Sequence, residues 1–236
     1  MNSSDYQVSK IDKRLARTLI KTHHYSKAWS SSKYTIGLLK NDFVVGVACY
    51  GSPVGRMVSD SISPLIKQNE ILELKRLWIA DSEGKNVESW FLGQTFKWLK
   101  LNDKTIKVLV SYSDPDHGHL GIIYQATNWL YQGDQMNTSK SFFYKIKGNL
   151  LHPRTVFNKY GTNEESELRK IDPELQLVQT MYKHRYLYIL APKRERKRIV
   201  DSLKHPILPY PKSLDHSKMV GVNSLIQNEK SKKFFE

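Results

Sequence analysis

Apolar and polar positions follow two different periods along the first fifty residues. After Ser9, a candidate helix N-cap, apolar side chains recur at helical spacing and predict a helix that ends near Thr22. Two apolar runs follow over residues 33–51, separated by Lys-Asn-Asp, which is typical hairpin chemistry. We therefore expect one helix and then two antiparallel strands.

The middle of the chain predicts a strand, a helix and a second strand. Residues 71–80 are rich in strand-forming side chains and stop at the polar stretch 81–86. Residues 87–102 carry an apolar stripe at helical spacing, and residues 106–113 are almost wholly apolar, like a strand buried on both faces. This order predicts two parallel strands connected by a helix.

The second half of the chain predicts a helix and late strands. Residues 120–132 repeat apolar side chains at helical spacing, with Gly133 as a candidate C-cap. Residues 140–156 and 180–191 indicate strands, and the polar stretch between them indicates a surface excursion or a small helical insert. We expect a domain over residues 1–191, followed by a basic, proline-containing and partly mobile extension over residues 192–236.

Composition favours a polyanionic partner. The 236 residues hold 37 Lys and Arg against 23 Asp and Glu, a net charge of +14. Such a surface attracts DNA or RNA, although solubility and attraction to anionic lipid remain alternatives. The one cysteine, Cys49, lies in an apolar run and fits a buried strand in a reducing compartment. No apolar run approaches the roughly 18 residues of a membrane span, so we expect a soluble, cytoplasmic protein without a membrane partner.

The predicted order of elements resembles the GCN5-related N-acetyltransferase (GNAT) fold. That resemblance implies an α/β (α+β) architecture with a mixed, mainly antiparallel central sheet flanked by helices. Members of that fold bind acyl-CoA with a basic, glycine-rich loop before a helix. Here the stretch "EGKNVESW" has only Gly84. The resemblance therefore leaves acetyl-CoA or another small donor open.

Four blocks of sequence are similar to a narrower family. They are "HHYS", "LKRLWIADSEGKNVESWFLG", "SYSDPDHGHLGIIYQATNWLYQG" and "LHPRTVFNKYG", between about residues 20 and 161. Their order and spacing resemble the Mom family of phage DNA-modification proteins. The resemblance implies an enzyme that adds a carbamoylmethyl-type group to N6 of adenine in DNA and protects that DNA from restriction. It also implies double-stranded DNA and a small-molecule donor as partners, iron as a cofactor, and the host cytoplasm as location.

The candidate chemistry centres on Asp114, which follows a predicted buried strand. Its carboxylate is a candidate general base or metal ligand, and a turn or helix cap is the structural alternative. Asp116, His117 and His119 fit cap and surface groups. His24 with Tyr25 matches the family's His-Tyr pair. The resemblance implies His24 and Asp114 as iron ligands, while Tyr25 is alternatively a stacking surface for an extruded base. Trp29 and Tyr112 are further candidate walls for that base.

Four residues are candidates for holding the donor. Arg76 lies in a central strand, where its guanidinium should meet a carboxylate or a phosphate, either in a structural salt bridge or in donor binding. Ser89 is a candidate N-cap or a hydrogen-bond donor to the donor molecule or substrate. Lys85 and Asn86 precede the same helix and suit an anion there, although a solvated loop is equally compatible.

A second group of residues predicts contacts with nucleic acid. Cations interleaved with aromatic side chains suit a phosphate backbone beside an unstacked base, and sheet-edge lysines exposed to solvent are the alternative. The group consists of Lys145, Lys147, His152, Arg154, Lys159 and Tyr160. The charge run over residues 193–198 fits nonspecific phosphate contacts or simple solvation.

Two other functions remain compatible with the sequence. One is a conventional acyl-CoA-dependent N-acetyltransferase that acts on a protein or a small amine. The other is a noncatalytic basic DNA-binding protein, whose binding would depend steeply on salt and would not depend on Asp114. The oligomeric state is open.

Overall fold

The computed structural model describes residues 2–55, 57–115, 118–134, 142–180 and 182–213. The chain divides into two compact units, and each is described by itself. Unit 1 comprises Met1–Tyr112, Gly121–Gly133 and Arg185–Tyr210, and unit 2 comprises Ser113–Leu120, Asp134–His184 and Pro211–Glu236. The predicted boundary at residue 191 stays a prediction.

Unit 1 is built on a seven-stranded sheet with the order β1-β2-β3-β4-β5-β10-β6. The pairs β1–β2, β2–β3, β3–β4 and β10–β6 are antiparallel, and β4–β5 is parallel. The strands are β1 (Tyr6–Lys10), β2 (Tyr34–Lys40), β3 (Phe43–Gly51), β4 (Ile71–Ile79), β5 (Val108–Ser113), β6 (Leu130–Gly133) and β10 (His184–Ile189). The predicted mixed, mainly antiparallel sheet is confirmed.

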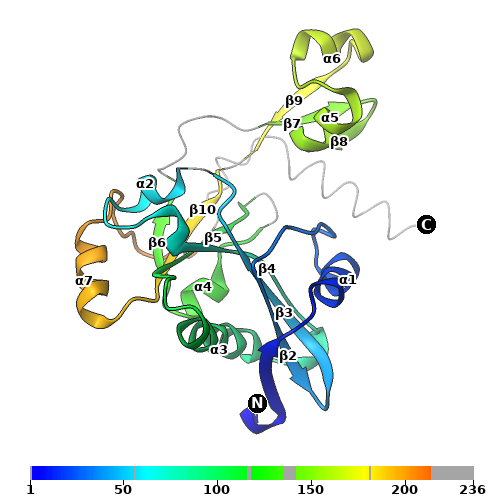
Figure 1. The fold of residues 1–236 in the computed structure, drawn as a ribbon. Helices are drawn as coiled ribbons and strands as arrows, with labels where there is room; N and C mark the ends of the chain where they lie inside the picture. Colours follow the sequence, from blue (N-terminus) through cyan, green and yellow to red (C-terminus); the bar gives the residue numbers. More distant parts are fainter. Residues whose placement is uncertain (1, 56, 116–117, 135–141, 181, 214–236) are drawn as a thin grey trace. The chain divides into compact units, whose positions relative to one another are not determined.

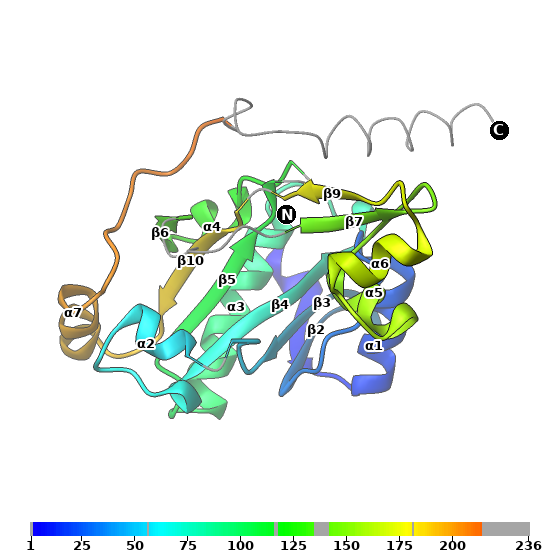
Figure 2. The same cartoon turned by 90° about the horizontal axis from the view of Figure 1, so that it is seen from above.

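Helices cover both faces of this sheet (Figure 1). Side chains alternate along β3, so that Val47 and Cys49 pack against α1 (Lys13–His23), while Ala48 and Tyr50 join the cluster under α3 (Val87–Asn102). Two further helices, α2 (Val58–Ile62) and α7 (Lys193–Asp201), pack beside β5 and β10 (Figure 2). Cys49 is buried as predicted, and burial raises the pKa of its thiol to about 11.

Two local signals explain the first half of unit 1. Asn41 and Asp42 have φ values of 48° and 65°, as a two-residue type I′ hairpin turn requires, and Asn and Asp tolerate that conformation. Asp12 caps α1, because its side chain accepts hydrogen bonds from the backbone N–H groups of residues 14 and 15. The prediction of Ser9 as the cap was wrong, since Ser9 lies in β1, a strand that the pattern did not predict.

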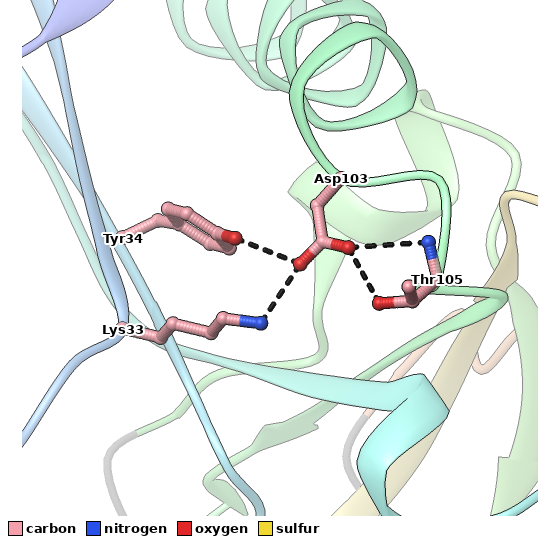
Figure 3. Close-up of polar contacts among 4 residues, drawn as sticks. All are labelled: Lys33, Tyr34, Asp103 and Thr105. Carbon is pink, nitrogen blue, oxygen red and sulfur yellow. Dashed lines mark hydrogen bonds and ion pairs between the residues drawn. The ribbon is translucent and has the colours of Figure 1, made fainter.

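Asp103 connects the end of α3 to the start of β2 (Figure 3). Its carboxylate accepts hydrogen bonds from Lys33 Nζ at 2.8 Å, Tyr34 Oη at 2.7 Å, and Thr105 N and Oγ1 at 3.1 and 2.5 Å. Burial acts to raise the pKa of Asp103, but the hydrogen bonds from Lys33, Thr105 and Tyr34 outweigh it and hold that pKa well below its ordinary value.

One predicted element of the second half was wrong in part. The expected helix over residues 120–132 ends early, because α4 covers only Ile122–Ala126 and the chain then forms β6, which pairs with β10. The charge run over residues 193–198 lies on α7, and Ile199 of that helix is buried in the core. A search of the described residues finds no helix that is long and apolar enough to cross a bilayer.

Unit 2 contains a three-stranded antiparallel sheet with the order β8-β7-β9 and two helices. Its elements are β7 (Phe142–Ile146), β8 (Asn149–Leu151), α5 (Pro153–Tyr160), α6 (Glu165–Ile171) and β9 (Gln176–Gln179). Its small core consists of Ile146, Val156, Leu168 and Leu175. The predicted strand over residues 140–156 therefore ends at Leu151, and α6 confirms the predicted helical insert.

Candidate functional site

The parallel strands β4 and β5 stop pairing before they end. Their register joins Ile71–Glu73 with Val108–Val110, and β4 then continues to Ile79 without a β5 partner. Ser111 bridges the point of separation, because its Oγ donates a hydrogen bond to the Leu74 carbonyl at 3.0 Å. The carboxyl ends of parallel strands are where α/β sheets hold reactive groups.

Tyr124, on α4, completes a short hydrogen-bond chain at this point. Its hydroxyl lies 2.8 Å from Ser111 Oγ. The Ser111 Oγ–H donates towards both the Leu74 carbonyl and the Tyr124 Oη, which share its one proton. Burial raises the pKa of Tyr124 to about 12, against the lowering effect of the hydrogen bond from Ser111. The phenol is therefore protonated at neutral pH.

Sequence reasoning did not single out Ser111 or Tyr124. The one available signal was a hydroxyl inside an otherwise apolar predicted strand, which requires a hydrogen-bond partner.

The predicted pair His24 and Tyr25 follows α1 directly. The helix ends at His23, and the His24 N–H donates to the Ile20 carbonyl at 3.1 Å. His24 is buried and Tyr25 is 56% exposed, with ring centroids 4.3 Å apart. His23 instead stacks on Trp78 at 4.8 Å. The two adjacent histidines thus have different surroundings, as expected, and His24 is the one that contacts Tyr25.

The hydrogen bonds of His24 fix its tautomer. Its Nδ1 accepts from the Ser26 backbone N–H at 3.1 Å and lies 2.9 Å from Ser26 Oγ. Since a backbone N–H only donates, Nδ1 has no proton in the neutral ring, and the proton is on Nε2.

The iron implied by the family resemblance does not fit the donor atoms of the described residues. A histidine that binds a metal through one nitrogen usually donates from the other, whereas the Nδ1 of His24 accepts. The described residues also contain no group of three His, Cys, Asp or Glu side chains arranged to hold a metal. Asp116 and His117 lie outside the described residues.

Arg76 binds the loop after α1. Its Nε donates to the Ala28 carbonyl at 2.9 Å, and its Nη1 donates to the Lys75 carbonyl at 2.6 Å. The structure thus gives the guanidinium two backbone carbonyl partners, whereas the sequence predicted a carboxylate or a phosphate. Because residue 28 lies in the loop that carries His24 and Tyr25, Arg76 is placed to position that loop.

The stretch before α3 is exposed and its backbone is unusual. Gly84 and Asn86 have φ values of 75° and 68°. Asn86 is the residue that precedes α3, and Ser89 lies inside the helix, where its Oγ donates to the Asn86 carbonyl at 3.1 Å. The prediction of Ser89 as the N-cap is therefore wrong. Lys85 is exposed at this positive end of the α3 dipole, which suits an anion.

Asp114 lies in unit 2, directly after β5. Its side chain is 15% exposed, and its Oδ2 is 3.3 Å from Lys183 Nζ. Its carbonyl accepts from the N–H of His119 at 3.1 Å, which closes the turn. His119 is exposed, as predicted. His24 and Tyr25 belong to unit 1, so a site shared by these residues and Asp114 stays a prediction.

Trp29 and Tyr112 are the other side chains predicted to line a pocket for the extruded base. Both are partly buried against core clusters. Trp29 packs against the cluster of Ala16, Ile20, Val47 and Cys49. Tyr112 packs against the cluster around β5 and β10, and burial raises the pKa of its phenol. These contacts give both side chains a structural role.

The predicted nucleic-acid residues occupy several elements of unit 2. Lys145 is on β7, Lys147 is in the β7–β8 turn with φ 49°, and Arg154, Lys159 and Tyr160 are on α5. Lys147, Arg154 and Lys159 are exposed, and Lys159 Nζ lies 5.3 Å from the centre of the Tyr160 ring.

His152 has a structural role within this group. It caps α5, because its Nδ1 accepts from the Arg154 N–H at 3.1 Å. Burial lowers its pKa, and the cations Lys183 and Arg154 lower it further. The lowered pKa of His152 favours its neutral form over the charged one.

Comparisons with known proteins identify the family. Residues 5–212 match the model of the Mom protein family. Methylcarbamoylase mom of Escherichia phage Mu is 28% identical over 211 residues, which cover 89% of this chain and 85% of that protein.

Solved acetyltransferases are more distant. An N-acetyltransferase from Staphylococcus aureus Mu50 is 12% identical with a TM-score of 0.43, covering 79% of this chain and 99% of that one. A Bacillus subtilis acetyltransferase in complex with CoA is 10% identical with a TM-score of 0.43, covering 79% and 98%. These scores carry no functional argument, whereas the family match spans most of the sequence. The chain belongs to the Mom protein family.

Proposed function

We propose that this protein adds a carbamoylmethyl-type group to N6 of adenine in double-stranded DNA and so protects that DNA from restriction. The observation that carries the proposal is the family match over residues 5–212, together with the relative named methylcarbamoylase mom. The net charge of +14 supports DNA as the substrate, because phosphates attract such a surface.

The substrate base must leave the duplex, since N6 of a paired adenine is occupied by the base pair. Extrusion costs a few kcal/mol. Tyr25 supports this step, because its ring is 56% exposed at the end of α1. Stacking of a base on an aromatic ring contributes about 1–3 kcal/mol, which offsets much of the cost of extrusion.

In the proposed reaction, N6 displaces a leaving group from the methylene carbon of a small donor. The N6–carbon bond forms, the bond to the leaving group breaks, and N6 loses one proton. Asp114 accepts that proton. The leaving group departs with the electron pair of the broken bond and takes up a proton from water. Lys85 and the first turn of α3 attract the anionic part of the donor.

Mass spectrometry of nucleosides tests the proposal. DNA is isolated from a host that expresses the protein and from the same host with an empty vector. We expect a deoxyadenosine derivative heavier by one carbamoylmethyl substituent in the first sample only. Unaltered deoxyadenosine beside abundant soluble protein would overturn the proposal, and an acetyl increment on protein or small amines would favour the acetyltransferase alternative.

A further inference from the structure

Helix α1 carries cations along its exposed face. Arg14, Arg17 and Lys21 are exposed and separated by three and four residues, so they lie on one face of the helix. The sequence of α1, KRLARTLIKTH, contains no acidic residue. Among the described residues, none of these three side chains lies within ion-pair distance of a carboxylate. Asp12, the N-cap of α1, attracts Arg14 electrostatically without forming an ion pair, so the face keeps a net positive charge.

Other helices of this chain neutralise part of their charge. On α6, Arg169 pairs with Glu165 and Lys170 with Glu167. On α7, Lys197 pairs with Asp201. Like charges at helical neighbour positions each cost a few tenths of a kcal/mol, so the row on α1 opposes helix formation. A polyanionic partner would remove that repulsion.

The apolar face of α1 is already occupied. Ala16 and Ile20 are fully buried against Val47 and Cys49 of β3. An amphipathic helix binds a membrane by inserting its apolar face, and here most of that face is packed on β3, with Leu15 alone 43% exposed among the leucine and isoleucine side chains of α1. The exposed face of α1 therefore suits a partner recognised by charge alone.

The row of cations leads to the predicted site residues. From Arg14 to Lys21 the helix rises about 10 Å at roughly 1.5 Å per residue. That length equals the axial rise of about three nucleotides at roughly 3.4 Å each. The helix ends at His23, and the exposed Tyr25 ring follows two residues later.

We infer that Arg14, Arg17 and Lys21 bind phosphates of one DNA strand over a span of about three nucleotide steps, and so set the register that presents a base to Tyr25. The inference rests on DNA being the substrate, as proposed above. It assigns DNA positioning to α1 of unit 1, in addition to the cations of unit 2.

Salt-dependent binding tests this assignment. Affinity for a labelled duplex of about twenty base pairs is measured by fluorescence anisotropy between about 50 and 200 mM salt. The variant Arg14→Ala/Arg17→Ala/Lys21→Ala should lower the slope of log K against log salt by about 2–3, because each phosphate contact contributes roughly 0.9. Its binding should weaken about tenfold or more at 100 mM salt.

Two variants serve as controls. Lys97→Ala/Lys100→Ala/Lys104→Ala removes the same charge from exposed positions on α3 and directly after it, and should change the slope by less than about 1. Arg14→Lys/Arg17→Lys keeps the charge and should keep the slope. Equal losses from the α1 variant and this control would show that net charge alone governs binding and would overturn the inference, as would an unchanged slope for the α1 variant.

The proposed function and the inference about α1 can fail independently of each other. If the wild-type protein leaves adenine unmodified but the α1 variant selectively lowers the slope, the inference stands as a DNA-binding surface and the modification proposal falls. If modification is present and the α1 variant has the wild-type slope, only the inference falls.

Discussion

Replacing Asp103 by alanine should destabilise unit 1, because one carboxylate connects two elements distant in sequence. The side chain is 9% exposed and accepts from Lys33, Tyr34 and Thr105 (Figure 3). A hydrogen bond to a charged group contributes about 1.5–3 kcal/mol. The ion pair with the half-exposed Lys33 contributes less, below about 1 kcal/mol, because solvent screens it. With partial rescue of the freed groups by water, we expect a loss of about 3 kcal/mol in the free energy of unfolding.

The effect should depend on pH in a defined direction. Because the pKa of Asp103 is lowered in the folded protein, its contribution is complete above the unfolded value of about 3.9 and is lost as pH falls towards the folded pKa. Between pH 7 and pH 3, about 1 kcal/mol of the difference between wild type and Asp103→Asn should disappear.

Urea denaturation followed by tryptophan fluorescence measures both effects. Asp42→Asn is a matched control, since Asp42 is exposed in a turn whose left-handed conformation Asn also adopts. A loss below about 1 kcal/mol for Asp103→Ala at pH 7, or a difference that grows as pH falls, would refute the reasoning.

Further substitutions address the site and its supports. Tyr25→Ala should reduce DNA modification at least about tenfold, while Tyr25→Phe should stay near wild type, because stacking needs the ring and not the hydroxyl. Equal losses of modified deoxyadenosine from both variants in nucleoside mass spectrometry would contradict this. Arg76→Ala should raise amide hydrogen exchange around Ala28, and unchanged exchange there would show that the guanidinium does not hold the loop. Gly121→Ala should lower the free energy of unfolding by about 2 kcal/mol or more, because φ is 74° and the new Cβ would lie 2.6 Å from the Tyr186 ring. Urea denaturation that gives wild-type stability would contradict this prediction.

Local sequence patterns predicted those elements whose structure depends mainly on residues near them in the chain. The hairpin was predictable because Asn41 and Asp42 favour its turn, and α3 was predictable because sixteen residues carry one apolar stripe. The parallel pair β4–β5 was predictable because the helix between the two strands carries the chain back along the sheet, so that both strands run in the same direction.

Long-range pairing explains the errors. The stretch Leu130–Gly133 has helical spacing, but pairing with β10 makes it a strand. Strand β1 is a short edge strand that pairs only with β2, so its own five residues give a weak signal. Likewise, Arg76 was placed correctly on a central strand, yet only coordinates reveal that its partner is the Ala28 carbonyl.

The most direct test of the account is DNA modification by Asp114→Asn, with Asp42→Asn as the control. The account predicts that Asp114→Asn abolishes the carbamoylmethyl derivative of deoxyadenosine, because an amide does not accept the N6 proton, while duplex binding stays within about twofold of wild type. The control should modify DNA fully. Wild-type levels of modified deoxyadenosine with Asp114→Asn would contradict the claim that this carboxylate drives the reaction.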